Sequence, residues 1–177
     1  LDGVTAAEGV YYIDLIANRE GSTQESVYRF YTIPDSVDKV ALRGGRMPQR
    51  DDECLADSFH NDDSVLGTKI TITDSNDADS LEKVVQRTFT IVGYVSSPLY
   101  MDMNRGTTTV GSGSLADCFY GPKAALENDY YTEIHLRLDG ALDVPGDFGP
   151  DVADLVVAFF RREVTTASGF VAQSKGG

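Results

Sequence analysis

Hydrophobic and polar residues alternate in short runs along most of the chain, which is the pattern of β-strands with one buried face. In the first such run, residues 10–17, Tyr11, Ile13 and Leu15 fall on one side, and we expect that side to be buried. Further strands are predicted where valine, isoleucine and aromatic residues gather. These runs are residues 26–33, 52–57, 67–75, 87–95, 115–121 and 130–140.

The run at residues 130–140 has the most regular alternation in the chain. Ile134, Leu136 and Leu138 share one face, so we expect that face to be buried. His135 falls on the opposite, polar face, and His60 lies in a polar turn. Both histidines are therefore predicted at the surface rather than in a catalytic or metal site.

One amphipathic helix is predicted, over residues 149–164. Its apolar residues follow the spacing i, i+3, i+4, i+7 and i+8, which places them in one stripe. They are Val152, Leu155, Val156, Phe159 and Phe160. Single helical turns are predicted at residues 61–67 and 122–128. We expect this helix to lay its apolar stripe on a sheet.

A long segment, residues 96–114, separates two of the predicted strands. It exceeds the roughly 12–15 residues beyond which connections without secondary structure are uncommon. Its glycines match neither the Walker phosphate-binding pattern nor a dinucleotide fingerprint. No serine in the chain has the Gly-x-Ser-x-Gly frame of a hydrolase nucleophile. The segment therefore carries no recognisable nucleotide-binding or hydrolytic device.

The charge of the chain argues against one class of partner. Lys and Arg number 15 and Asp and Glu number 28, which gives a net charge of −13. Such a surface repels phosphate backbones, so nucleic acid is not expected as a partner. The composition, with 41% hydrophobic residues, is that of a globular protein. A chain of 177 residues fits one domain, or two small subdomains that share a core.

Metal, cofactor and catalytic sites are not predicted. The acidic run at residues 74–85 departs from a calcium-binding EF-hand loop. The departures are Ala78, Asp79 and Val85. Two cysteines are too few for a disulfide scaffold or a structural zinc site. Cys54 and Cys118 lie in apolar runs, so we expect two small buried hydrophobes. A single disulfide between them, outside the cytoplasm, is the alternative.

The start and the hydropathy of the chain leave two interpretations open. The chain begins at Leu1, and no basic stretch followed by an apolar signal region is present. The apolar run at residues 155–160 is far shorter than the roughly 20 residues of a membrane span. The sequence is then either a complete soluble protein with a trimmed start or a domain taken from between segments of a longer one.

Four short motifs follow one another in an order that points to one family. They are Gly45-Arg46, Asp52-Glu53 with the strand at residues 54–56, residues 67–72, and residues 89–93. In this order they resemble the extracytoplasmic core domain of FtsX-like and MacB-like ABC transporter permeases. The stretches "SPLYMDMNRGTTTVGSGSL" and "DYYTEIHLRLDGA" are similar to the large permeases of this type found mainly in Gram-positive bacteria. The sequence departs from that pattern mildly, at both cysteines and around Gly111.

The resemblance implies a fold and a location. A domain of this family lies at the extracytoplasmic face of the cell membrane, between the first two membrane helices of the permease. It implies one α+β extracytoplasmic domain, residues 1–177, with two lobes. One lobe combines approximately residues 1–40 with 120–177 as a sheet with helices, and residues 41–119 form a small β-rich lobe.

The resemblance also implies a function without enzyme activity. ATP hydrolysis belongs to a separate cytoplasmic ATPase subunit or domain. The extracytoplasmic domain passes ATP-driven motion to an exported substrate or an extracellular partner. The implied partners are the membrane helices of the same chain, the ATPase, and a second permease copy or half. No catalytic, cofactor-binding or metal-binding residue is implied.

Within this interpretation the long segment is a candidate contact with a partner. We expect Tyr100, Met101, Met103 and Arg105 to be at least partly exposed there. The alternative is that Leu99 and Tyr100 only close the core while the glycines form turns. A second function also stays open, a free-standing secreted module that binds peptides or glycans. Such a module would use the tyrosines and methionines as its contact surface.

Overall fold

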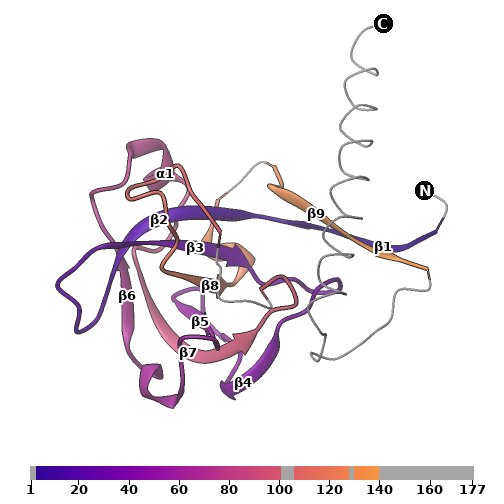
Figure 1. Cartoon of the computed structure of the whole chain (residues 1–177), viewed down its shortest axis with the longest axis horizontal. Coiled ribbons are helices and arrows are strands. Elements are labelled where there is room, and N and C mark those ends of the chain that lie inside the picture. The colour runs from indigo at the N-terminus through magenta and orange to yellow at the C-terminus, as the bar shows by residue number, and fades with distance from the viewer. Residues whose placement is uncertain (1–2, 101–105, 128–129, 140–177) are drawn as a thin grey trace, which may run out of the picture. The chain divides into compact units, whose positions relative to one another are not determined.

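The structure is a computed structural model that describes residues 3–100, 106–127 and 130–139 (Figure 1). In that part, 46% of the residues lie in strands and 8% in helices. The described part of the chain is therefore mostly β, where an α+β fold was expected. The helix predicted over residues 149–164 lies outside the described residues. The two predicted helical turns are confirmed as the 3₁₀ turns Asp63–Val65 and Lys123–Ala125.

The described elements are nine strands and one short α-helix. The strands are β1 (Val4–Val10), β2 (Tyr12–Arg19), β3 (Ser26–Thr32), β4 (Ala41–Gly45), β5 (Glu53–Asp57), β6 (Lys69–Ile72), β7 (Thr88–Ser96), β8 (Asp117–Gly121) and β9 (Glu133–Leu138). The helix α1 (Ala78–Glu82) starts at Asp77, whose carboxylate accepts a hydrogen bond from the Ser80 backbone N–H. β4 and nearly all of β1 lie outside the predicted strands, and α1 falls in the acidic run at residues 74–85.

Six strands close into a barrel-like sheet (Figure 1). The order is β4-β7-β5-β8-β3-β2-β6, and β6 also pairs with β7. One edge of β7 is shared, because residues 88–90 pair with β6 and residues 93–96 pair with β4. The other edge of β7 pairs with β5. β7 thus closes the barrel, and β4 remains an added strand at its rim.

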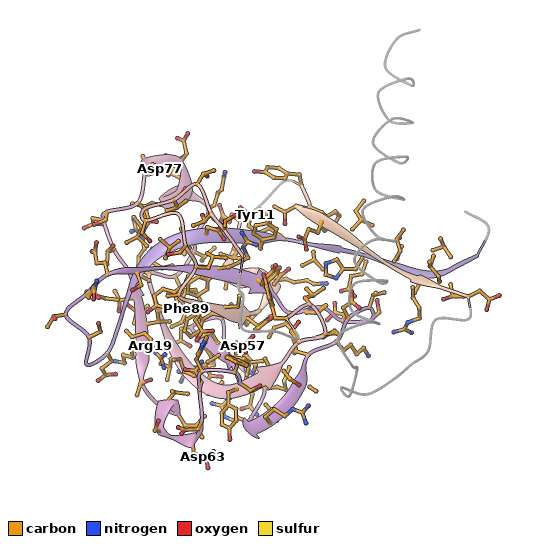
Figure 2. All side chains as sticks on the ribbon, in the orientation of Figure 1. Tyr11, Arg19, Asp57, Asp63, Asp77 and Phe89 are labelled. Carbon is orange, nitrogen blue, oxygen red and sulfur yellow. The ribbon has the colours of Figure 1, made fainter. Side chains whose placement is uncertain are left out.

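The barrel interior holds the main hydrophobic core. The predicted buried face of β2 is confirmed, because Tyr11, Ile13 and Leu15 all belong to this interior set. Phe30 stacks on Phe119 with ring centroids 5.5 Å apart. Tyr11 and Phe89, labelled in Figure 2, belong to the same set. Burying such side chains contributes about 1.5–3 kcal/mol each to stability.

A second hydrophobic cluster lies on the outer face of the same strands. It contains Leu55, Val95, Cys118 and Tyr120, while Cys54 belongs to the interior set. The two cysteines are therefore on opposite faces of the sheet, and both are buried and form no disulfide. This confirms the expectation of two small buried hydrophobes and excludes the alternative disulfide.

The chain divides into two compact units, residues 8–135 and residues 1–7 with 136–177. The barrel belongs to the first unit. In the described part of the second unit, Thr5 Oγ1 donates a hydrogen bond to the Arg137 carbonyl oxygen over 3.2 Å. The two lobes expected from the resemblance stay a prediction. The barrel itself combines β2 and β3, expected in one lobe, with β5, β6 and β7, expected in the other.

The prediction of which face of β9 is buried is wrong. Ile134 is 54% exposed, whereas His135 is only 6% exposed. β9 pairs with β1 in a two-stranded sheet and is not a barrel strand, so its apolar side chains have no barrel core to enter. His135 also corrects the expectation that both histidines lie at the surface. His60 is exposed, as predicted.

Candidate functional site

The four sequence motifs meet along three residues of β7. The Thr90 N–H donates to the Asp52 carbonyl oxygen, over 2.8 Å. The Gly67 N–H donates to the Ile91 carbonyl oxygen, also over 2.8 Å, and the Arg46 N–H donates to the Val92 carbonyl oxygen over 2.9 Å. Segments that are far apart in the sequence therefore form one hydrogen-bonded unit around β7.

An ion pair closes the loop between the first two motifs. The Arg46 guanidinium makes two hydrogen bonds to the Glu53 carboxylate, over 2.7 and 2.6 Å. The Gln49 backbone N–H donates to the same carboxylate over 2.8 Å. These bonds hold the pKa of Glu53 at about 2. Since Glu53 is almost fully buried, the pair satisfies a carboxylate that would otherwise lack partners.

Two glycines make this arrangement possible. Gly45 has a left-handed backbone, with φ of 73°, and a Cβ there would collide with the Val92 carbonyl oxygen. A Cβ on Gly93 would lie 2.6 Å from the Arg46 carbonyl oxygen. The glycines in both motifs are therefore required by the close approach of β4 and β7.

The predicted contact segment is only partly described. Met101, Met103 and Arg105 lie outside the described residues, so their exposure stays a prediction. Tyr100 is half-buried, and its hydroxyl lies 2.8 Å from the Tyr31 hydroxyl. Burial raises the pKa of Tyr100 to about 12. Leu99 beside it is 38% exposed.

Tyr100 joins a set of tyrosines on the outer face of the barrel. Tyr31 stacks on Tyr120 at 5.6 Å, and Tyr12 lies 5.3 Å from Tyr31. The Arg29 guanidinium lies 4.2 Å above the Tyr12 ring, within cation–π distance. Tyr100 packs partly against this outer cluster. This packing agrees with the alternative in which Tyr100 closes the core. A partner contact at Met101, Met103 and Arg105 stays a prediction.

The end of the long segment folds back on the sheet. Gly111 and Gly113 both have positive φ, of 54° and 82°. The Gly113 N–H donates to the Val110 carbonyl oxygen, and the Ala116 N–H donates to Val27 at the start of β3. The glycine-rich part from residue 106 onward thus forms a hydrogen-bonded turn.

A loop at residues 34–38, which we call the clasp loop, binds a carboxylate of β1. The backbone N–H groups of Asp35, Ser36 and Val37 all donate to the Glu8 carboxylate, over 2.6–2.9 Å. The Ser36 hydroxyl donates to it as well, and Lys123 Nζ lies 3.4 Å away. Successive backbone N–H groups of this kind form an anion-binding nest.

The electrostatics of Glu8 follow from this nest. Burial alone would raise its pKa, because the side chain is only 8% exposed. The backbone N–H groups of the clasp loop outweigh burial and lower the pKa to about 2. Glu8 is therefore ionised and fixed at neutral pH.

The clasp loop also binds β9. Asp38 Oδ2 lies 3.1 Å from His135 Nδ1, and Glu133 Oε2 lies 3.0 Å from His135 Nε2. Burial would lower the pKa of His135, but the ion pairs with these two carboxylates raise it to about 9. Asp38 adopts a left-handed backbone, with φ of 53°, which aspartate tolerates better than most residues. One short loop thus holds a charged residue of β1 and another of β9.

The clasp loop was not predicted. Its sequence, "PDSVD", and Glu8 both lie outside the elements that the hydrophobic pattern predicts. The contacts join residues up to 97 positions apart, from Asp38 to His135, so no local spacing reveals them. The only available signal was a histidine in an otherwise alternating strand.

A buried polar network links the end of β5 to the start of β8. Asn61 Nδ2 donates to the Asp57 carbonyl oxygen over 2.6 Å and to Asp117 Oδ2 over 2.7 Å. Burial raises the pKa of Asp117, and the hydrogen bond from Asn61 offsets part of that shift. Within the described ranges, no three His, Cys, Asp or Glu side chains are grouped as metal ligands. Likewise, no helix there is long and apolar enough to cross a membrane.

Comparison with known proteins gives matches among solved structures. No protein-family model matches the chain, and no curated protein matches it. The chain is similar to the extracellular domain of the noncanonic ABC-type transporter YknZ from Gram-positive bacteria. The identity is 13% over 79% of this chain and 68% of that chain, with a TM-score of 0.46. It is also similar to the periplasmic region of MacB from Actinobacillus actinomycetemcomitans. There the identity is 14% over 93% of this chain and 69% of that chain, with a TM-score of 0.44.

Proposed function

We propose that this chain is the extracytoplasmic domain of an ABC transporter permease. One observation carries the proposal: the motifs of the sequence resemblance are joined by hydrogen bonds along residues 90–92 of β7. Motifs that resembled the family by chance would have no reason to meet in space. The domain would have no catalytic role, and its location would be the extracytoplasmic face of the cell membrane.

We further propose that the domain transmits ATP-driven motion through the clasp loop. In a domain placed between two membrane helices, β1 and β9 carry the chain from and towards those helices. Glu8 and His135 lie at the two ends of the unit that contains the barrel. A displacement of either strand would therefore pull on the clasp loop first.

Ionic and backbone contacts suit this role because they are directional. The Glu8 nest supplies four N–H and O–H donors, and each charge-assisted bond contributes about 1.5–3 kcal/mol. With pKa values near 2 and 9, both Glu8 and His135 stay charged across neutral pH. The clasp loop would thus hold over the range of pH that most cells experience.

Two observations on the full-length protein test the assignment. The reading frame that contains this chain should encode membrane-spanning helices on both sides of it. Affinity purification of the full-length protein from membranes should bring down a cytoplasmic ATPase. A reading frame with no membrane-spanning helix on either side would remove the proposal.

The secreted binding module remains the second candidate. It is favoured by the exposed tyrosines at residues 130 and 131, which are 55% and 65% exposed. A protein released into the medium without a membrane anchor would favour this candidate over the permease.

A further inference from the structure

A small hollow of about 240 Å³ opens beside the exposed Tyr131. Its lining residues are Gly9, Tyr11, Thr32, Lys123, Leu126 and Tyr131. We propose that this hollow, which we call the tyrosine hollow, binds a pyranose ring of a carbohydrate. The inference does not depend on the transport function, because it rests only on the surface around the hollow.

Tyr131 is an exposed ring that is nevertheless held in place. The base of the ring lies directly on Gly9, where a Cβ would collide with it. The next residue, Thr132, is fixed at both its backbone and its hydroxyl. Its N–H donates to the Val10 carbonyl oxygen over 3.0 Å, and its Oγ1 accepts from the Tyr12 N–H over 2.8 Å. A ring that is both 65% exposed and anchored is ready to stack without a large loss of entropy.

Tyr130 provides a second oriented ring. It meets the buried Tyr11 ring edge-on, with centroids 6.0 Å apart and an interplanar angle of 81°. The Tyr130 side chain raises the pKa of Lys83. Tyr130 and Tyr131 thus expose apolar aromatic surface near the hollow.

A polar pair lies at the rim. Lys123 Nζ is 2.7 Å from Asp35 Oδ2, and the Asp35 side chain is 77% exposed. An ammonium has three donors and a carboxylate has several acceptor positions, so both retain capacity for a ligand. Donor and acceptor side by side match the vicinal hydroxyl groups of a sugar.

The chemistry of the hollow selects a sugar over other ligands. A pyranose has one face of C–H groups, which carry partial positive charge and pack on the negative face of an aromatic ring. Its hydroxyls would reach the Lys123–Asp35 pair at the same time. The hollow is smaller than the roughly 300–1,000 Å³ of drug-sized ligand sites, so one sugar ring fits better than several peptide residues.

The test is a titration of the isotope-labelled 177-residue chain followed by two-dimensional NMR. The probes are methyl glycosides and trisaccharides of glucose, N-acetylglucosamine, galactose and mannose, up to about 20 mM. At least one should shift the amide signals of residues 9–11 and 130–132, with a dissociation constant on the order of 1 mM. Tyr131→Ala should weaken that binding at least about tenfold.

Two further variants separate the ring from its position. Gly9→Ala keeps both tyrosines but displaces the Tyr131 ring, so it should weaken binding as well. Phe59→Ala removes another exposed aromatic, 46% exposed and not among the residues that line the hollow, and should leave binding unchanged. Native signal dispersion of each variant shows that it is folded.

Three results would overturn the proposal. The first is a panel in which no sugar shifts these signals. The second is sugar binding that Tyr131→Ala leaves intact. The third comes from a parallel titration with proline- and aromatic-containing tripeptides: a response at the hollow to these peptides alone would assign it to peptide recognition.

Discussion

At the scale of single residues, two buried charges decide how the clasp loop responds to pH. Glu8 has a pKa of about 2, below the ordinary value of 4.5. Its stabilising effect is therefore fully present above about pH 4.5 and is lost as the pH falls towards 2. Glu8→Gln should lower the free energy of unfolding by about 1–3 kcal/mol at pH 7. Chemical denaturation of both proteins measures this change in the free energy of unfolding.

The pH dependence makes this prediction specific. The difference between wild type and Glu8→Gln should shrink between pH 4.5 and pH 2.5, because the carboxylate of the unfolded chain, with a pKa near 4.5, then takes up a proton, while the folded-state carboxylate, with a pKa of about 2, stays mostly ionised. Glu82→Gln, at an exposed position at the end of α1, is the matched control and should change little. A constant difference across this range would contradict the nest as the source of the stability.

His135 responds at the opposite end of the pH scale. Its pKa is raised from 6.5 to about 9, so its contribution is fully present below about pH 6.5 and is lost as the pH rises through 9. An NMR titration of the imidazole should show this value. Asp38→Asn should lower the pKa of His135, because asparagine tolerates the same left-handed backbone but carries no charge. An unchanged pKa of His135 in that variant would contradict Asp38 as a cause of the raised pKa.

At the scale of elements, the approach of β4 to β7 depends on glycine. Gly93→Ala should lower the free energy of unfolding by about 1–3 kcal/mol, because its Cβ would press on the Arg46 carbonyl oxygen. Gly121→Ala is the matched control in another strand. Its Cβ would meet the Ala125 Cβ at an ordinary 3.8 Å. If Gly93→Ala and Gly121→Ala were equally stable in thermal denaturation, this would contradict the close approach of β4 to β7.

Local pattern was enough to predict most barrel strands. In β2, β6 and β7 every second residue is buried, so the alternation of residues such as Ile70 and Ile72 reports the fold directly. β4 was missed because its residues are largely exposed and two of its five are glycines. Closure of the barrel was not predicted either, since it depends on β7 exchanging partners along its length.

The candidate site was far less predictable. The tyrosine-bearing segment was noticed from its composition, and the structure describes only Tyr100 of the four residues singled out there. The clasp loop depends on contacts between distant residues, and β9 carries its buried residue at a polar position. Burial by ion pairing leaves no hydrophobic signal, so His135 was assigned to the wrong face.

At the scale of the whole molecule, the clasp loop is, under the proposed function, the place where motion enters the barrel-containing unit. The N–H groups of residues 35–37 are bonded to Glu8 in the structure, so their exchange with solvent reports whether the nest is closed. Any ATP-driven displacement of β1 or β9 must therefore change that exchange. Glu8→Gln should abolish the change while leaving ATP hydrolysis in place.

The decisive measurement is hydrogen–deuterium exchange of residues 34–38 in the full-length protein, reconstituted in lipid nanodiscs with its ATPase. We predict that exchange in this loop differs by at least about tenfold between the nucleotide-free and ATP-bound states, which corresponds to about 1.4 kcal/mol of opening free energy. The same exchange in both states, in a complex that hydrolyses ATP, would contradict the clasp loop as the coupling point.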